Sequence, residues 1–191
     1  MQKDKTEWLV YAILAINFIV FGLIELSPGG PAEYVYALVR FGALSRDLIV
    51  MGEYHRLFTA MFVHIGWAHL LYNSMSLYIF GSRCEPHFGR LRFLLIYVVT
   101  GLCGNLVSLS MRPGVVAGAS GAIFGLLGAL LGAAMRSRSL VGGLNAKSYL
   151  LFAVVSLGLG LFTPNVANEA HLAGLVAGVL LGVSMKRNTV Q

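Results

Sequence analysis

Residues 115–135 read VVAGASGAIFGLLGALLGAAM and contain no charged side chain. Within them, the glycines that follow Ser120 stand at positions 121, 125, 128 and 132, in steps of four, three and four. On an α-helix this spacing forms one stripe of small residues. The last apolar segment repeats it with Gly174, Gly178 and Gly182. Such stripes let two helix backbones approach closely, so we expect these helices to pair; the alternative is that each packs against another helix.

The composition is that of a membrane protein. Hydrophobic residues make up 57% of the 191 residues and charged residues only 12%, with a mean hydropathy of +0.76. Soluble domains usually carry about 25% charged residues. The solvent for this chain is therefore expected to be the lipid bilayer. The net charge of +6 lies mainly at the ends of apolar runs, which favours a role in membrane orientation and not in nucleic-acid binding.

The apolar runs predict an all-α integral membrane protein with six transmembrane helices, near residues 8–26, 66–83, 91–111, 118–136, 147–163 and 168–186. Residues 33–56 mix aromatic, aliphatic and charged residues, and no part of them is long enough to span a bilayer. Short amphipathic helices in the membrane interface suit this segment. We expect a single membrane domain, residues 1–191, without a separate cytosolic domain.

The basic residues predict the orientation of the chain. Six spans put both termini on one side of the membrane, and ten of the 14 lysines and arginines would lie on that side. These ten are Lys3, Lys5, Arg83, Arg90, Arg92, Arg136, Arg138, Lys147, Lys186 and Arg187. The positive-inside rule therefore predicts cytoplasmic termini. We expect a multi-pass protein of a prokaryotic cell (inner) membrane.

Ser120 and His171 are the candidate catalytic pair. Ser120 lies one residue before the first glycine stripe and His171 lies three residues before the second, so pairing of the stripes would bring them to neighbouring helix ends. A histidine inside a membrane span is costly and usually marks a function or a polar partner. Neutral imidazole is the usual base that activates a serine hydroxyl. Glu169, two residues from His171, points to another helix face and is not counted as a third member.

His69 and Asn73 are four residues apart and therefore share a helix face. Both can donate hydrogen bonds while neutral, so with the Ser120 N–H they could form an oxyanion hole. One alternative is that the two side chains satisfy each other in a core. Another is a metal site of His64, His69 and His171. We disfavour a metal, and expect no cofactor, because no carboxylate or cysteine joins these histidines at a ligand spacing.

Taken together, these motifs resemble those of the rhomboid intramembrane serine proteases. The resemblance extends from the first apolar segment to the last, and it depends on the order of the motifs more than on any one of them. The residues that carry it are Arg56, His64-x₄-His69-x₃-Asn73, Gly118-x-Ser120-Gly121 and Ala170-His171-x₂-Gly174-x₃-Gly178.

The resemblance implies a rhomboid-like bundle of six helices that cleaves transmembrane segments of membrane-protein substrates near the outer face of the membrane. Ser120 would be the nucleophile and His171 the general base. His69, Asn73 and the Ser120 amide would stabilise the oxyanion, and Gly118 would keep the approach to the serine open.

Other positions would support this site. Arg56 would belong to the loop between the first two helices, Glu85 would be a structural glutamate near the cytoplasmic end of the second, and Gly174 belongs to the stripe after the histidine. Two positions depart from the family pattern. His55 replaces the tryptophan that precedes Arg56, and Phe124 replaces a tyrosine that stacks on the catalytic histidine in many members.

The expected substrate is a transmembrane helix that unwinds locally, because helical backbone groups are paired internally. Residues 148–162 would form the gate for this substrate, and residues 163–168 would form the cap over the site. The rival hypotheses are a small transporter and a client-binding relative without catalysis. Inverted sequence halves would support a transporter, and none is evident. No oligomeric state follows from the sequence.

Overall fold

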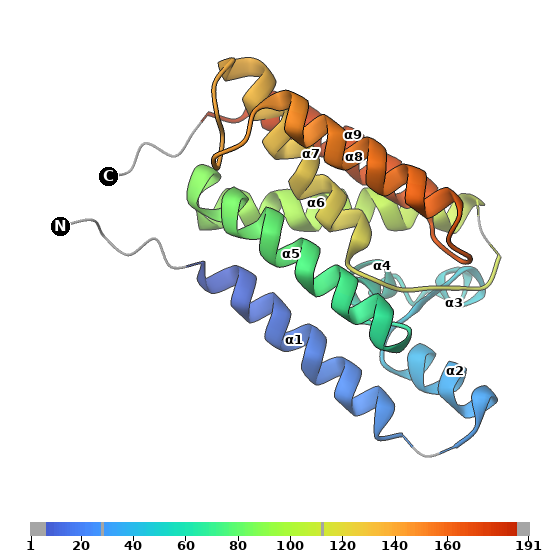
Figure 1. Ribbon diagram of the computed structural model, residues 1–191. Coiled ribbons are helices and arrows are strands. Elements are labelled where there is room, and N and C mark those ends of the chain that lie inside the picture. Colours follow the sequence, from blue (N-terminus) through green and yellow to red (C-terminus); the bar gives the residue numbers. More distant parts are fainter. Residues whose placement is uncertain (1–6, 28, 112, 187–191) are drawn as a thin grey trace.

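The computed structural model describes residues 7–27, 29–111 and 113–186, and in these ranges the chain is mostly helical (Figure 1). The predicted all-α class is confirmed. Four of the 14 basic residues, Lys3, Lys5, Arg112 and Arg187, lie outside the described residues. The elements in chain order are α1 Trp8–Glu25, α2 Pro31–Arg40, β1 Leu44–Ser45, α3 Arg46–Val50, α4 Arg56–Thr59, the 3-10 helix η1 Ala60–Phe62, α5 Gly66–Phe88, α6 Arg90–Met111, β2 Val115–Val116, α7 Ser120–Ser137, α8 Ala146–Leu161 and α9 Asn168–Ser184.

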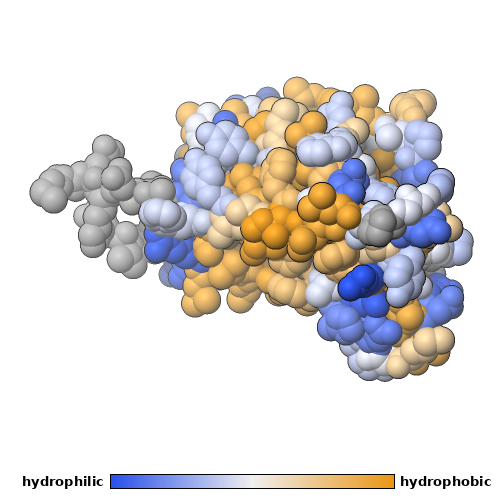
Figure 2. Space-filling model, turned by 90° about the horizontal axis from the view of Figure 1, so that it is seen from below, coloured by the Kyte–Doolittle hydropathy of each residue, from blue (hydrophilic) through white to orange (hydrophobic). Residues whose placement is uncertain are grey.

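The long helices give the molecule a surface suited to lipid. Within the described ranges, α1, α6 and α7 are long and apolar enough to cross a membrane by length and composition, and α8 and α9 are shorter apolar helices. Figure 2 shows a face on which apolar side chains occupy the middle and hydrophilic side chains gather toward both ends. Large apolar side chains such as Ile19, Leu151 and Leu180 are exposed, as in a protein whose solvent is hydrocarbon.

The second long helix extends further than expected. The sequence predicts a polar turn over residues 83–92, whereas α5 continues through Glu85, and only Gly89 separates it from α6. The physical reason is that Glu85 is buried and its carboxylate accepts hydrogen bonds from the N–H groups of Leu9 (3.3 Å) and Val10 (3.1 Å). The first N–H groups of a helix have no partner within it, so Glu85 caps α1 and fastens it to α5.

α7 lies in the middle of the bundle, and all of its residues from Gly121 to Ala134 are buried (Figure 1). Its main partner is α9, as the two glycine stripes predict. A Cβ atom added to Gly174 would overlap the carbonyl oxygen of Gly121, and one added to Gly178 would overlap that of Gly125. The two backbones are therefore in direct contact, and larger side chains at these positions would force the helices apart.

The segment between α1 and α5 lies at the end of the bundle opposite the start of α1 and the end of α9 (Figure 1). It contains α2, α3 and α4, and its β1 pairs antiparallel with β2, so that Leu44 faces Val116 and Ser45 faces Val115. This pairing ties the segment to the loop before α7. Sequence patterns do not reveal it, because two residues are too few to show strand alternation.

We predict that Gly178→Ala lowers the free energy of unfolding by about 1–3 kcal/mol, because the new methyl group overlaps the α7 backbone. The matched control is Gly158→Ala in α8, where nothing lies within 4 Å of the added Cβ. Alanine is the better helix former by about 1 kcal/mol, so this control should be neutral or stabilising. Unfolding of both variants in the same detergent tests this, and equal effects would contradict the close contact.

Candidate active site

Ser120 is the first residue of α7, and the loop before it is held in place by its backbone. The Gly118 N–H donates to the carbonyl oxygen of Ala60 in η1, at 2.9 Å. Gly118 and Ala119 are buried, whereas Ser120 is half-buried. Because the first N–H groups of a helix have no intrahelical acceptor, the start of α7 offers donors and a partial positive charge beside the Ser120 hydroxyl.

Gly118 allows the imidazole of His69 to lie against this loop. Its φ of +126° is one that residues with a side chain rarely adopt. A Cβ atom at this position would lie 2.7 Å from both Cε1 and Nε2 of His69 and 3.9 Å from Oγ of Ser120. Glycine therefore lets the Nε2 side of His69 face the backbone next to the serine.

The hydrogen bonds of His69 indicate which nitrogen carries the proton. The Ile65 N–H donates to Nδ1 of His69 at 3.3 Å. In a neutral imidazole the other nitrogen then bears the hydrogen, so Nε2 is assigned as a donor that faces Gly118. His64 packs beside this ring, with centroids 5.2 Å apart. Burial lowers the pKa of His64 to about 3, so that side chain is neutral.

Asn73 lies one turn after His69 on α5 and is buried. Its Nδ2 donates to the backbone carbonyl oxygen of His69 at 2.9 Å, and not to the imidazole. The two side chains therefore do not simply satisfy each other. Nδ2 has a second hydrogen, so the amide can also donate to a ligand.

His171 is buried near the start of α9, and its ring stacks on Phe124 of α7. The ring centroids are 4.4 Å apart and the planes differ by 11°. Phe124 lies four residues after Ser120, which places both on one face of α7. Phe124 therefore stacks on the histidine as a tyrosine would, but it has no hydroxyl.

The supporting residues lie apart from this group. Arg56 is buried and donates to the carbonyl oxygens of Val39 and Ala43, and it pairs with Glu53 at 2.7 Å. It therefore holds the connecting segment together although His55 beside it is exposed. Glu85 lies at the far end of α5, 16 residues from His69, or about 24 Å along the helix.

Glu169, two residues before His171, contacts α6. The Ser108 hydroxyl of α6 donates to its Oε1 at 3.1 Å. Three further groups shape the site and were not predicted: the Ala60 carbonyl, the Ile65 N–H, and the Tyr34 hydroxyl, which accepts from the Gly66 N–H at 3.0 Å. The first two are backbone groups and leave no signal in the residue types.

The histidines do not gather into a set of metal ligands. Among the residues that the structure describes, no three His, Cys, Asp or Glu side chains are grouped as a metal site requires. His64 and His69 are neighbours on one side of the loop before α7, while His171 stacks on Phe124 from α9. The arrangement brings a serine hydroxyl, an imidazole and several hydrogen-bond donors to the start of α7 and its neighbours, and these are groups that acyl transfer uses.

Comparison with known proteins finds relatives of this chain. The family model described as Rhomboid domain matches residues 51–188. Rhomboid protease GluP of Bacillus subtilis is 37% identical over 175 residues, which are 92% of this chain and 34% of that protein. RHOMBOID-like protein 1 of Arabidopsis thaliana is 34% identical over 203 residues, 92% of this chain and 52% of that protein. The chain thus spans about a third to a half of the length of these two relatives.

We predict that Gly118→Ala is more harmful than Gly114→Ala. Both positions have positive φ, +126° and +91°, so both changes impose backbone strain. Only at Gly118 does the new methyl group also collide with His69, which should cost about 1–3 kcal/mol more. Thermal unfolding of the two variants in one detergent measures the difference. Equal destabilisation would show that His69 does not lie against Gly118.

Proposed function

The chain belongs to the rhomboid family, and from this premise we propose that it is an intramembrane serine endopeptidase with a catalytic dyad of Ser120 and His171. The observation that carries the proposal is the stack of His171 on Phe124, one helical turn beyond Ser120. The stack fixes the imidazole against the face of α7 that bears the serine. A neutral imidazole there is suited to accept the serine proton.

In the proposed reaction, Ser120 Oγ attacks the carbonyl carbon of the scissile peptide while His171 takes the hydroxyl proton. His171 then gives this proton to the leaving nitrogen, the C–N bond breaks, and an acyl-enzyme remains on Ser120. Water, deprotonated by the same imidazole, hydrolyses the ester and restores the serine. The proposed site is a dyad, with no role assigned to Glu169, whose Oε1 accepts a hydrogen bond from Ser108 on α6.

We assign the oxyanion hole to the His69 Nε2–H, the second Nδ2 hydrogen of Asn73 and the Ser120 N–H. Support comes from the orientation of His69, whose Nδ1 accepts from Ile65 and whose Nε2 side lies over Gly118. All three are neutral donors, as a site in a low-dielectric environment requires. The start of α7 adds the positive end of the helix dipole.

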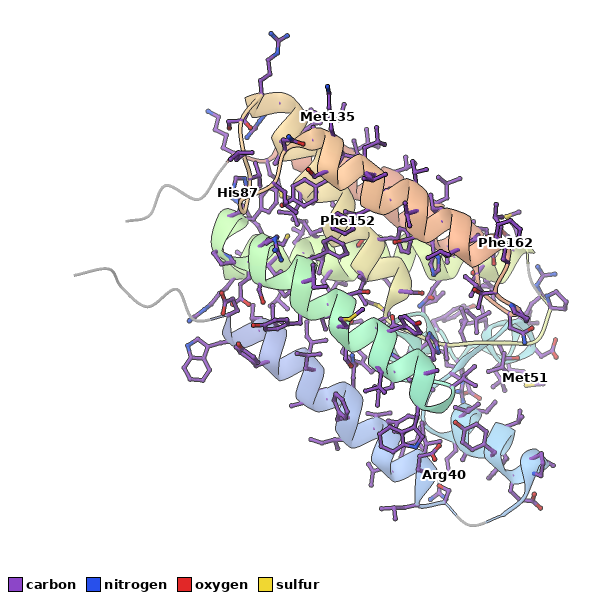
Figure 3. The ribbon with its side chains drawn as sticks, in the orientation of Figure 1. Arg40, Met51, His87, Met135, Phe152 and Phe162 are labelled. Atoms are coloured by element: carbon purple, nitrogen blue, oxygen red, sulfur yellow. The ribbon has the colours of Figure 1, made fainter. Side chains whose placement is uncertain are left out.

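We further propose six membrane spans, α1, α5, α6, α7, α8 and α9, in one membrane domain with both termini in the cytoplasm. The start of α1 and the end of α9 lie at one end of the bundle, where the turns after α5 and α7 also lie (Figure 1). Figure 3 places His87 and Met135 at that end, and Arg40, Met51 and Phe162 at the other. The candidate site then opens toward the outer face. We also propose a prokaryotic cell (inner) membrane; of the two relatives described above, one comes from a bacterium and the other from a plant.

The proposed substrates are transmembrane helices of other membrane proteins, which would reach Ser120 past α8. Within the described chain, only Tyr149 and Ala153 of α8 are buried, so this helix is held less firmly than α7. Its contact with α5 includes the edge-to-face pair of Phe152 and Phe80, with centroids 5.7 Å apart (Figure 3). Displacement of α8 and of residues 162–167 would admit a locally unwound segment.

We predict that Ser120→Ala and His171→Ala each abolish labelling by a fluorophosphonate probe and reduce cleavage of a transmembrane substrate by at least about 10³-fold. The matched controls are Ser110→Ala and His55→Ala, which change exposed side chains away from the stack and should keep parental activity. Labelling that persists in the Ser120→Ala variant would overturn the assignment of the nucleophile.

We predict a different result for the oxyanion donors. His69→Ala and Asn73→Ala should each lower kcat by about 10²–10³-fold with a small change in KM, because these donors act on charge that develops in the transition state. Fluorophosphonate labelling should be slowed but still depend on Ser120. A change confined to KM in both variants would instead assign these residues to substrate binding.

A further inference from the structure

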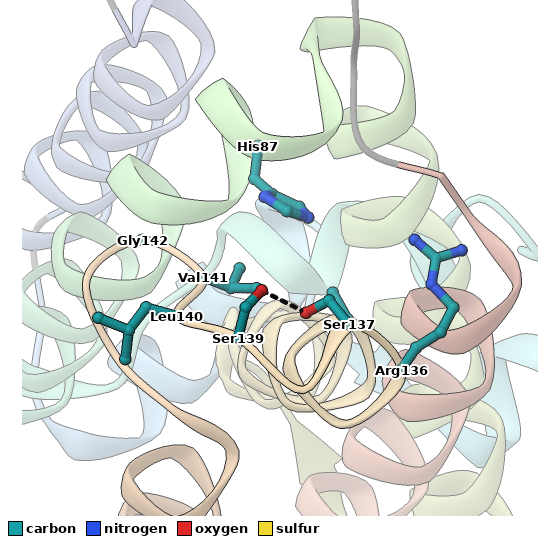
Figure 4. Close-up of a pocket in the computed structure, with 8 residues that line it drawn as sticks. His87, Arg136, Ser137, Ser139, Leu140, Val141 and Gly142 are labelled. Carbon is teal, nitrogen blue, oxygen red and sulfur yellow. Dashed lines mark hydrogen bonds between the residues drawn. The ribbon is translucent and has the colours of Figure 1, made fainter.

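A polar cavity lies at the end of the bundle opposite the candidate active site. It has a volume of about 140 Å³ and lies between the last turn of α5, the last turn of α7 and residues 139–142 (Figure 4). A single water needs about 10–15 Å³ of such space, so the cavity has room for a larger group. Nothing in the proposed reaction uses it.

The cavity is lined by hydrogen-bond donors. The Ser139 hydroxyl donates to Ser137 Oγ at 3.0 Å, which leaves the Ser137 hydrogen to donate to a ligand. Figure 4 shows the imidazole of His87 pointing from α5 toward these hydroxyls, while the guanidinium of Arg136 rises from the end of α7 beside α9, where Nη1 donates to the Val183 carbonyl oxygen at 3.4 Å. The set suits a tetrahedral anion, because guanidinium and hydroxyl groups together match its several acceptor oxygens.

Residues 139–144 form a hairpin that is one wall of the cavity, and hydrogen bonds and packing hold it in place. Val141 and Leu144 exchange backbone hydrogen bonds of 2.8 and 3.1 Å, and the Tyr149 hydroxyl donates to the Val141 carbonyl oxygen at 2.6 Å. Gly142 packs directly on the side chain of Arg83, where a Cβ would come within 2.7 Å. The hairpin therefore closes the cavity in a fixed position against α5.

The charge around the cavity is positive. Among the described residues, those that line it include no acidic side chain. Arg83 lies under the hairpin, and Arg138 and Lys147 flank it in sequence. Glu85, near in sequence to His87, is engaged by the first N–H groups of α1. An anion in the cavity would thus meet Arg136, with Arg83 under the hairpin, and no acidic side chain among the described lining residues.

We propose that this cavity binds the phosphate group of an acidic phospholipid. A lipid is favoured over a free anion because Leu140, which lines the cavity, is 65% exposed, and Met135, next to Arg136 in the sequence, is 54% exposed. Figure 3 shows Met135 at the same end as His87. These side chains would contact the acyl chains while Arg136 and the two serines bind the phosphate. The proposal does not depend on proteolysis.

The test uses the purified full chain in nanodiscs of phosphatidylcholine with increasing phosphatidylglycerol, and measures retained phosphatidylglycerol by native mass spectrometry. Arg136→Gln should weaken retention about fivefold, which corresponds to one basic contact at a membrane surface. Arg136→Lys should restore part of it. The control Lys147→Gln removes the same charge at the same end but does not line the cavity, and should change retention less than twofold.

Equal losses in Arg136→Gln and Lys147→Gln would overturn the proposal in favour of a diffuse basic surface, and so would no loss in either. Ser139→Val, which removes a hydroxyl without changing charge, should also weaken retention and guards against a misfolded Arg136 variant. A final arm adds inorganic phosphate to the protein in phosphatidylcholine alone. If phosphate raises the unfolding temperature as much as phosphatidylglycerol does, the ligand is a free anion and the lipid assignment is wrong.

Discussion

Direct backbone contact between α7 and α9 is the constraint on which the rest of the structure depends. Gly174 and Gly178 on α9 touch the carbonyl groups of Gly121 and Gly125 on α7, and no larger residue fits there. In lipid, helices gain little from burying apolar surface against each other, so close van der Waals packing must hold them. The same contact fixes the start of α9 beside the start of α7, and this brings His171 to the face that bears Ser120.

The elements around this pair are fastened mainly by buried polar groups that bind backbone. Glu85 caps α1, Arg56 collects carbonyl oxygens of the connecting segment, and Asn105 of α6 donates to the Leu57 carbonyl oxygen at 2.8 Å. Each satisfies groups that would be costly to leave unpaired away from water. Fold and site are thus coupled, because the loop that carries Gly118 is bonded to η1 within this same framework.

Much of the fold follows from particular residues in the sequence. The glycine steps of α7 and α9 predict their pairing because a helix converts a spacing of about four residues into a stripe. The long apolar runs predict the helices to within a few residues. The turn after α5 is misplaced, because charged Arg83 and Glu85 indicate a surface, whereas the partner of Glu85 comes from α1, far away in sequence.

The sequence by itself determined the all-helical class, the membrane environment, the helix pair at the centre and the residue types of the candidate site. Only the tertiary structure decided how these side chains are oriented: the Nε2 side of His69 over Gly118, the stack of His171 on Phe124, and the β1–β2 pairing that holds the loop before α7. The physical reason is that periodicity acts within one helix. Orientation depends on backbone partners, such as the Ile65 N–H, that no residue type encodes.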